Sequence, residues 1–369
     1  MPRFFICVYY PLMIARRISR QVFVGSVPVG GGAPITVQSM TNAMPDDFAG
    51  TLAQINECAA LGASIMRVSI PNAAAADVLK RIVPLSKVPL VADIHFDWRM
   101  GLLAADAGAA ALRINPSNIG SMENIREIVA AARANKCSIR IGVNSGSLEQ
   151  NLLTKYGDPC ADAMVESALT QARALEDLNF SDIKISVKSS STVMTIEAYE
   201  KLATACDYPL HLGVTEAGGL FDGSIKVAMA FGALLWQGIG DTLRISLSAD
   251  PADEVRAGIK MLKAFGFSDR GLKITSCPTC SRRCIDVIKT VQMLEEKYKD
   301  EARPVSVAVM GCIVNRQEAN RVDAGVYGAS QEDKTAMLCV RGRRPELIKS
   351  SDVFARLCAE IDRVLANGD

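Results

Sequence analysis

Short runs rich in β-branched residues recur along the first three quarters of the chain, and an amphipathic, alanine-rich stretch follows each of them. Such runs favour strands and such stretches favour helices, so the pattern predicts repeated strand–helix units. There are about eight units, the number that closes a parallel barrel. An open doubly wound sheet is the competing architecture, but no Gly-x-Gly-x-x-Gly turn follows the first expected strand. The expected strands span residues 36–40, 65–70, 90–95, 111–116, 139–144, 183–188, 210–216 and 243–247.

The pattern changes after Arg270-Gly271. We expect strands at 273–275, 305–310 and 336–340, a helix at 285–297 and a closing helix at 351–365. These elements predict a compact α+β module of about a hundred residues, near the lower end of domain sizes. The sequence therefore predicts an α/β chain with a TIM barrel over residues 1–271 and a small α+β domain over residues 272–369.

Cationic side chains stand near the carboxyl ends of the expected barrel strands, often at a spacing of two from another polar residue. Side chains two apart lie on one face of a strand, and this end of a parallel barrel is the catalytic face. Any single arginine could be salt-bridged to a neighbouring carboxylate, but five cations at equivalent positions favour a multiply charged anion, most simply a diphosphate. The five are Arg67, Arg113, Arg140, Lys188 and Arg244.

Other polar residues occupy the same ends of the expected strands. His95 and Glu216 are the candidate acid–base groups, because both side-chain types transfer protons in active sites. The residues expected to line the site beside the cations are Asp93, Asn115, Asn144 and Ser246.

Charge and hydropathy restrict the classes of partner. The 41 Lys and Arg residues nearly balance the 40 Asp and Glu residues, so no global field attracts nucleic acid or an anionic membrane. The apolar segment 4–15 is too short to span a bilayer and no small-residue cleavage motif follows it, so we interpret it as a strand or docking segment. We expect a cytoplasmic protein that binds neither nucleic acid nor membrane.

Three cysteines stand out among 11, in a chain with only 2 histidines. Cys277-Pro278-Thr279-Cys280 places two thiols on one tight turn, and Gly311-Cys312 supplies a third. This set fits either a zinc site or an iron–sulfur cluster that leaves one position to another ligand. Most of the other cysteines are expected to be buried free thiols of a reducing compartment.

The ordered motifs of the chain closely resemble those of the 4-hydroxy-3-methylbut-2-enyl diphosphate synthase family, from about Arg16 to Asn315. Those of the barrel are Val37-Gln38-Ser39-Met40-Thr41-Asn42, Val91-Ala92-Asp93-Ile94-His95-Phe96-Asp97, Arg113-Ile114-Asn115-Pro116, Arg140-Ile141-Gly142-Val143-Asn144, Thr215-Glu216-Ala217-Gly218-Gly219 and Gly240-Asp241-Thr242-Leu243-Arg244. Those of the second domain are Cys277-Pro278-Thr279-Cys280-Ser281-Arg282 and Gly311-Cys312-Ile313-Val314-Asn315.

The resemblance implies a TIM barrel that binds 2-C-methyl-D-erythritol 2,4-cyclodiphosphate and a second domain that holds a 4Fe-4S cluster. The implied reaction is reductive ring opening with loss of water in the non-mevalonate isoprenoid pathway, with electrons from ferredoxin or flavodoxin. Cys277, Cys280 and Cys312 match the family's three thiolate ligands, and Glu318 is the candidate for its exchangeable glutamate ligand. The family closes each site with the partner subunit, so a homodimer of the bacterial form is implied.

The chain departs from the family pattern around the cluster. The family usually reads Asn-Gly-Pro-Gly-Glu-Ala after the third cysteine, whereas this chain has Asn315-Arg316-Gln317-Glu318-Ala319, one residue shorter and without either glycine. Cys284, expected on the helix after Cys280, and Cys339 are spare thiols. These changes leave the barrel cations intact but affect the fourth ligand and the cluster pocket.

Three alternatives to an active synthase follow. One is a non-catalytic phosphate-binding barrel with a structural zinc held by Cys277, Cys280, Cys312 and either Cys284 or Cys339. The second is a family member whose activity is impaired by the altered cluster loop. The third is a related pterin-type or sugar-phosphate barrel enzyme without redox chemistry, which the cysteine-bearing domain disfavours.

Overall fold

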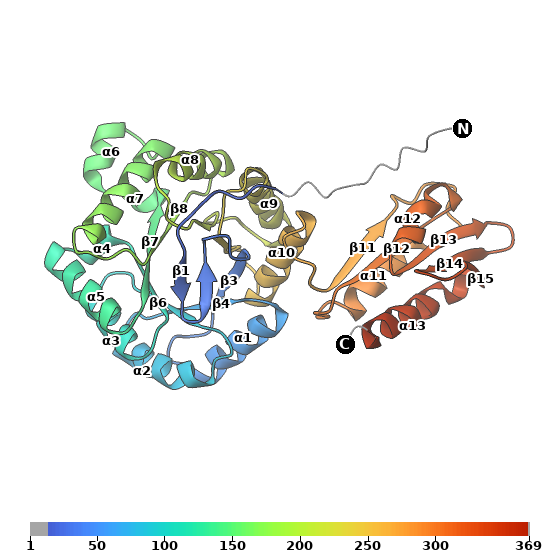
Figure 1. Cartoon of the computed structure of the whole chain (residues 1–369), viewed down its shortest axis with the longest axis horizontal. Coiled ribbons are helices and arrows are strands. Elements are labelled where there is room, and N and C mark those ends of the chain that lie inside the picture. The colour runs from blue at the N-terminus through green and yellow to red at the C-terminus, as the bar shows by residue number, and fades with distance from the viewer. Residues whose placement is uncertain (1–13, 368–369) are drawn as a thin grey trace. The chain divides into compact units, whose positions relative to one another are not determined.

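The computed structural model describes residues 14–367, which divide into two compact units between Phe267 and Ser268 (Figure 1). The apolar segment 4–15 lies almost wholly outside the described residues. No helix within 14–367 is long and apolar enough to cross a membrane.

The first unit is a barrel of eight parallel strands, as predicted. The strand order is β8-β7-β6-β5-β4-β3-β10-β9, and a bridge between Ile185 and Leu210 joins β8 to β9 and closes the ring. The strands are β3 (Thr36–Met40), β4 (Ile65–Ser69), β5 (Leu90–Asp93), β6 (Ala111–Ile114), β7 (Ser138–Asn144), β8 (Ile183–Lys188), β9 (His211–Leu212) and β10 (Thr242–Leu243).

The last two strands are much shorter than predicted. Residues 210–216 and 243–247 were expected to be extended throughout, but β9 and β10 contain two residues each. Glu216 has a φ of 52°, a left-handed conformation that a strand does not accommodate. The chain therefore leaves the barrel wall before it reaches Glu216.

Helices surround the barrel, one after each strand with two short additions (Figure 1). Several begin at an Asp, Asn or Ser whose side chain accepts a backbone N–H of the first turn, as an N-cap does. The helices are α1 (Phe48–Leu61), α2 (Ala73–Ile82), α3 (Trp98–Asp106), α4 (Pro116–Ile119), α5 (Met122–Ala134), α6 (Gln150–Tyr156), α7 (Ala161–Glu176), α8 (Thr192–Ala205), α9 (Leu220–Trp236) and α10 (Pro251–Ala264).

A hairpin that the sequence pattern did not predict covers the amino-terminal end of the barrel. It consists of β1 (Val22–Val24) and β2 (Val27–Val29). Its buried valines pack against Ile65, Val91 and Ala111, which lie at the starts of β4, β5 and β6. This end is thereby sealed by apolar contacts, and Figure 1 shows β1 at the centre of the strand ring.

The second unit is a five-stranded mixed sheet in the order β11-β12-β13-β14-β15. The first three strands are parallel, and β14 and β15 are antiparallel to their neighbours. Helices α11 and α13 pack on one face and α12 on the other. The elements are β11 (Leu272–Ser276), α11 (Val287–Lys297), β12 (Val305–Met310), α12 (Arg316–Arg321), β13 (Ala324–Ser330), β14 (Thr335–Val340), β15 (Glu346–Lys349) and α13 (Val353–Ala366).

Two expectations for this unit were wrong. The helix predicted from residue 285 begins at Val287, behind the N-cap Asp286, so Cys284 precedes the helix instead of lying on it. Strands β13 and β15 were missed, since Ala-Gly-Val-Tyr-Gly-Ala-Ser contains one β-branched residue and two glycines.

Candidate functional site

The interior of the barrel is lined by polar and charged side chains. Asp93, Arg113, Arg140 and Lys184 are successive Cα partners on β5, β6, β7 and β8. Because partners in a ladder share a face, these four side chains form one row around the inside of the wall. All four are at least nine-tenths buried. The outward residues beside them, such as Leu112, pack under the helices instead.

The structure brings the five predicted cations together inside this barrel. Arg67, Arg113, Arg140 and Lys188 are each less than a tenth exposed, and the Arg244 side chain is 16% exposed. Burial, together with the charges of Arg67 and Arg113, lowers the pKa of Arg140 well below its usual value. Burial and the neighbouring arginines act on the pKa of Lys188 in the same direction. The five cationic side chains therefore lie close enough to repel one another electrostatically.

Two buried carboxylates oppose these cations. Asp93 lies 3.3 Å from Arg113 Nη1 and 3.9 Å from Arg67 Nε. Burial alone would raise the pKa of Asp93, but the arginines hold it below its usual value, so it stays ionised. Glu254 on α10 lies 3.5 Å from Arg244 Nη2 and accepts a hydrogen bond from Ser39. Two carboxylates leave most of the positive charge uncompensated.

Several buried N–H groups of the cations have no hydrogen-bond partner among the described residues. An unsatisfied buried donor costs about 1–3 kcal/mol, and more when it is charged. A multiply charged oxyanion inside the barrel would accept hydrogen bonds from these groups and neutralise them. The unpartnered atoms are Arg113 Nε, Arg140 Nε and Nη2, Lys184 Nζ and Arg244 Nε.

Two glycines on the inner wall make room for the cations. A Cβ at Gly142 would lie 2.6 Å from Arg113 Nε, and a Cβ at Gly213 would lie 2.5 Å from Lys188 Cε. Any side chain at either position would displace the charged group beside it. The cationic cluster thus depends on small residues in the neighbouring strands.

The predicted acid–base groups lie at the carboxyl ends of the strands. The His95 ring is 2.9 Å from Asp93 Oδ2 and the side chain is about half exposed, so Asp93 connects His95 to the arginines. Glu216 is exposed, in the left-handed conformation described above. Non-glycine residues in that region are strained by about 1–3 kcal/mol and often mark functional sites.

The three remaining predicted residues differ in their surroundings. Asn115 is buried. Its Nδ2 donates a hydrogen bond to Ser147 Oγ at 3.4 Å, and its Oδ1 accepts one from Gln171 Nε2 at 3.5 Å. It is therefore held by the protein on two sides. Asn144 and Ser246 are half-buried, just beyond or at the ends of their strands.

A deeper polar layer was given no role from the sequence. Lys184 and His211 are fully buried, and burial with the charge of Arg140 lowers the pKa of Lys184 to about 7. Burial and nearby cations, Arg140 first, also lower the pKa of His211 far below its usual value. The sequence pattern places Lys184 on the same face of its strand as Lys188, four residues away, but that spacing alone assigns it no role. Polar side chains of the same interior are Thr36, Gln38, Ser138 and Thr242.

The three predicted metal ligands lie beyond the carboxyl ends of the adjacent parallel strands β11 and β12. Cys277 and Cys280 follow β11, and Cys312 follows β12. The Gly311 N–H donates to Cys277 Sγ at 3.1 Å, which links the two loops. The backbone N–H and the guanidinium of Arg282 hold the pKa of the Cys280 thiol below its usual value, and Arg282 also interacts with Cys312.

Glu318 lies in the first turn of α12, which directly follows the 3₁₀ turn Ile313–Asn315. The shortened segment is thus helical, and the half-exposed Glu318 carboxylate lies 3.7 Å from Arg321 Nη1. Cys284 N–H donates to Gly311 O, and burial together with the Cys312 charge raises the pKa of the Cys284 thiol.

The donor set suits an iron–sulfur cluster, whose irons are bound by cysteine thiolates. Within residues 14–367, no three Cys, His, Asp or Glu side chains converge closely enough to hold a metal ion as they stand. Two neighbouring loops nevertheless present three thiols, and Arg282 is placed to stabilise two of them as thiolates. A cluster would have to draw the two loops together.

Family models match both units of the chain. The GcpE TIM-barrel domain matches residues 19–259, and the GcpE protein C-terminal domain matches residues 273–363. A sialic acid synthetase from Leptospira borgpetersenii has a similar barrel, with a TM-score of 0.50 and 14% identity over 68% of this chain and 91% of its own. At this identity the likeness concerns the fold alone.

Curated relatives cover nearly the whole chain. A protein of Hyphomonas neptunium is 54% identical over 93% of this chain and 90% of its own length. A protein of a Ruegeria species is 51% identical over 96% of this chain and 93% of its own. Both are named 4-hydroxy-3-methylbut-2-en-1-yl diphosphate synthase (flavodoxin). Nothing in these comparisons supports a non-catalytic, zinc-binding barrel. The chain belongs to the GcpE family.

Proposed function

We propose that this chain catalyses the reductive ring opening and dehydration of 2-C-methyl-D-erythritol 2,4-cyclodiphosphate to 4-hydroxy-3-methylbut-2-enyl diphosphate, a step of the non-mevalonate isoprenoid pathway. On the uncharged formulas, two electrons and two protons enter and one water leaves. The names of the relatives support this reaction. The observation that carries it is the group of buried cations whose N–H donors lack partners among the described residues.

The cations would bind the cyclic diphosphate inside the barrel. Asp93 would orient the guanidinium groups of Arg67 and Arg113, as its ion pairs with both support. Exclusion of water from this interior would strengthen each contact with the anion. The proposed contacts are Arg67, Arg113, Arg140, Lys188 and Arg244, with hydrogen bonds from Asn115, Asn144 and Ser246.

Two groups at the barrel mouth would move protons. His95 is held by Asp93 at the barrel mouth and would donate a proton to the departing oxygen. Glu216 is exposed at the mouth and would serve as the second acid–base group.

A 4Fe-4S cluster would supply electrons to the substrate. Cys277, Cys280 and Cys312 would hold it, with Glu318 as an exchangeable fourth ligand. Arg282, beside Cys280 and Cys312, would offset the negative charge of the thiolates. We propose flavodoxin as the electron donor, in line with the name of the relatives. We also propose the cytoplasm as the compartment.

We further propose that the chain works as a homodimer in which one chain's cluster domain serves its partner's barrel. Apolar side chains form an exposed stripe on α9 at helical spacing, and large exposed apolar patches usually mark interfaces. Phe221, Ile225, Met229 and Trp236 are 48–77% exposed. This face is the candidate contact between the two copies.

Two measurements test the reaction. Anaerobically purified protein should contain about four irons, and Ser at Cys277, Cys280 or Cys312 should remove them, whereas Cys58→Ser should not. Stoichiometric zinc without iron would overturn the cluster.

Calorimetry then tests the substrate site. Arg140→Ala should weaken binding of the cyclic diphosphate about ten- to a hundredfold, since a charge-assisted contact contributes about 1.5–3 kcal/mol. Arg126→Ala, on the exposed face of α5, is the matched control. Equal affinity of both variants would place the substrate elsewhere.

Mixing two inactive variants tests the exchange between subunits. Cys312→Ser lacks a cluster ligand and Arg113→Ala lacks a barrel cation, so a mixed dimer retains one intact pair of domains. Activity should return in part when the subunits exchange. No recovery despite demonstrated exchange would mean that each chain completes its own site.

A further inference from the structure

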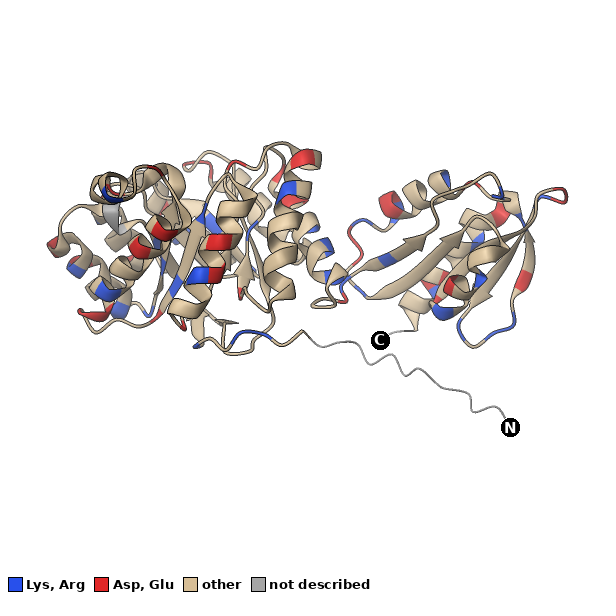
Figure 2. Ribbon diagram, turned by 90° about the horizontal axis from the view of Figure 1, so that it is seen from above, with Lys and Arg blue, Asp and Glu red and all other residues tan. Residues whose placement is uncertain are grey.

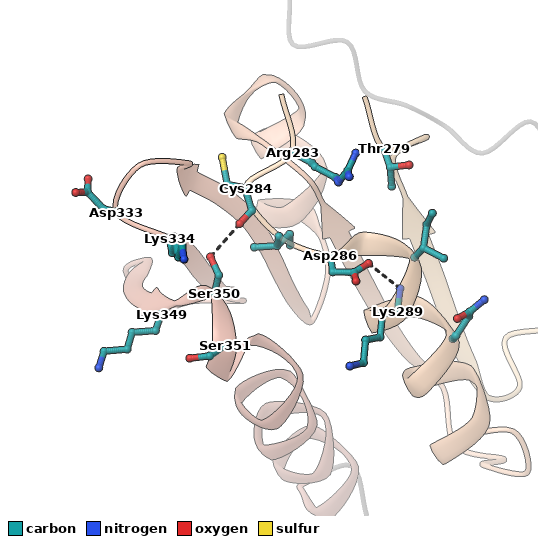
Figure 3. Close-up of a pocket in the computed structure, with 13 residues that line it drawn as sticks. Thr279, Arg283, Cys284, Asp286, Lys289, Asp333, Lys334, Lys349, Ser350 and Ser351 are labelled. Carbon is teal, nitrogen blue, oxygen red and sulfur yellow. Dashed lines mark hydrogen bonds between the residues drawn. The ribbon is translucent and has the colours of Figure 1, made fainter. Parts of the chain in front are cut away.

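A broad groove of about 970 Å³ lies beside the cysteine loop in the second unit. One wall is the loop itself, with Thr279, Arg283 and Cys284, and the other walls come from α11, the β13–β14 turn and the segment after β15 (Figure 3). Ser350 Oγ donates to Cys284 O at 3.0 Å, which ties the far wall to the loop. The groove therefore reaches within a few residues of the proposed ligand Cys280.

The groove is lined by cations. Arg283 and Lys289 lie on one side and Lys334 and Lys349 on the other (Figure 3). All four are exposed, and none forms an ion pair among the residues that the structure describes. Its acidic residues are Asp286 and Asp333, and Asp286 already accepts the Lys289 N–H as the N-cap of α11.

Elsewhere the charges are mixed. Figure 2 shows Lys and Arg interspersed with Asp and Glu over both units, in keeping with a formal net charge of +1. The lining of this groove holds four cations and two acidic residues, so the groove is locally basic. Ile288, which is 58% exposed, adds an apolar contact between the charged walls.

We propose that this basic groove docks an acidic face of the electron-donating flavodoxin beside the cluster. The inference rests on the function proposed above and adds the surface that the donor uses. Electron transfer weakens steeply with distance, so a donor must bind close to the cysteine loop. Complementary charge speeds such encounters, and transient redox complexes use small interfaces with polar rims.

A protein partner fits this groove better than a small anion. Sites for small ligands are enclosed and place a few buried polar groups on the ligand. Here the four cations are exposed and face each other across an open groove that no buried polar side chain of the lining completes. Exposed polar side chains around an apolar contact match the polar, solvent-accessible rim of a protein interface.

The test reverses charge on both sides of the groove in the cluster-loaded full chain. The variant is Lys289→Glu with Lys349→Glu. Glu is favourable in the first turn of α11, so the fold should tolerate the change. The matched control reverses two exposed cations of the barrel, Lys80→Glu with Lys87→Glu.

Binding of purified flavodoxin is measured by calorimetry, and turnover is measured with flavodoxin and with reduced methyl viologen. At low salt, the groove variant should bind flavodoxin at least about tenfold more weakly than the parent does. High salt should reduce this difference in affinity between the two proteins, because salt screens the charges. Its turnover with the viologen should equal that of the parent, because this small reductant needs no docking surface.

Different failures separate the two proposals. Flavodoxin affinity equal to that of the parent and the control would overturn the docking surface. A parallel loss of turnover with both reductants would also overturn it, and would point to contact of the groove with the partner subunit's barrel. A parent without turnover on either reductant would contradict the proposed reaction, while the affinities would still decide where flavodoxin binds.

Discussion

Replacing the buried lysine of the barrel should stabilise the protein. Lys184 is 0% exposed, and its Nζ has no hydrogen-bond partner among the described residues. Burial and the charge of Arg140 lower its pKa from 10.5 to about 7. Met has a similar length and carries no charge, so Lys184→Met removes the cost of burying an ammonium group.

The magnitude follows from the difference between the two states. A shift of about 3.5 pKa units corresponds to roughly 5 kcal/mol. Because the folded pKa is the lower one, the unfolded chain binds more protons between about pH 7 and pH 10.5, and stability rises with pH across that window. Below about pH 7, burial of Lys184 therefore lowers the free energy of unfolding by the full amount of roughly 5 kcal/mol. At about pH 9 this destabilisation falls to roughly 2 kcal/mol.

The assay is urea unfolding of the parent, Lys184→Met and Lys80→Met, an exposed lysine given the same change. We expect Lys184→Met to gain a few kcal/mol at about pH 6.5 and clearly less at about pH 9, and Lys80→Met to stay within about 0.5 kcal/mol of the parent. A gain that does not change with pH, or a loss of stability, would refute the account of Lys184 as a buried, uncompensated cation.

Two further predictions concern the two halves of the site. Gly142→Ala should displace the Arg113 guanidinium, since the new Cβ would lie 2.6 Å from its Nε, and should weaken calorimetric binding of the cyclic diphosphate by about tenfold or more. Gly146→Ala is the control, because a Cβ added there would meet no other atom within 4 Å, and it should bind the cyclic diphosphate like the parent. An affinity of Gly142→Ala equal to that of Gly146→Ala would contradict the steric argument. In the cluster domain, Glu318→Ala should alter the EPR signal of the reduced cluster, whereas Cys284→Ala should not. The reverse result would mean a cluster closed by four thiolates.

The barrel was predictable because its outer layer follows the ordinary rules. Outward residues of the strands are apolar, the helices after them are amphipathic, and the cations of the interior alternate with the apolar positions. Period-two alternation was sufficient to place Arg113 and Arg140 on one face of their strands and to predict their convergence.

The features that were missed depend on long-range contacts. The β1–β2 hairpin has three-residue strands, and its position follows only from the fit of Val22, Val24 and Val29 into the barrel end. The full burial of Lys184 and His211 follows from the closure of β8 on β9, which no local pattern shows. The helical form of the segment after Cys312 could not be read from a family pattern that places glycines there.

The polar interior has a consequence for how this barrel is held together. Barrels are ordinarily filled by branched apolar side chains, which contribute to stability. Here that contribution is confined to the hairpin end, where valines meet Ile65, Val91 and Ala111, and to the layer between strands and helices. Stability therefore comes from the outer layer and the sealed end, which leaves the interior free to hold charges that cost free energy until an anion binds. A ligand that satisfies those charges should stabilise the fold as well as react, since binding to the folded state alone shifts the unfolding equilibrium.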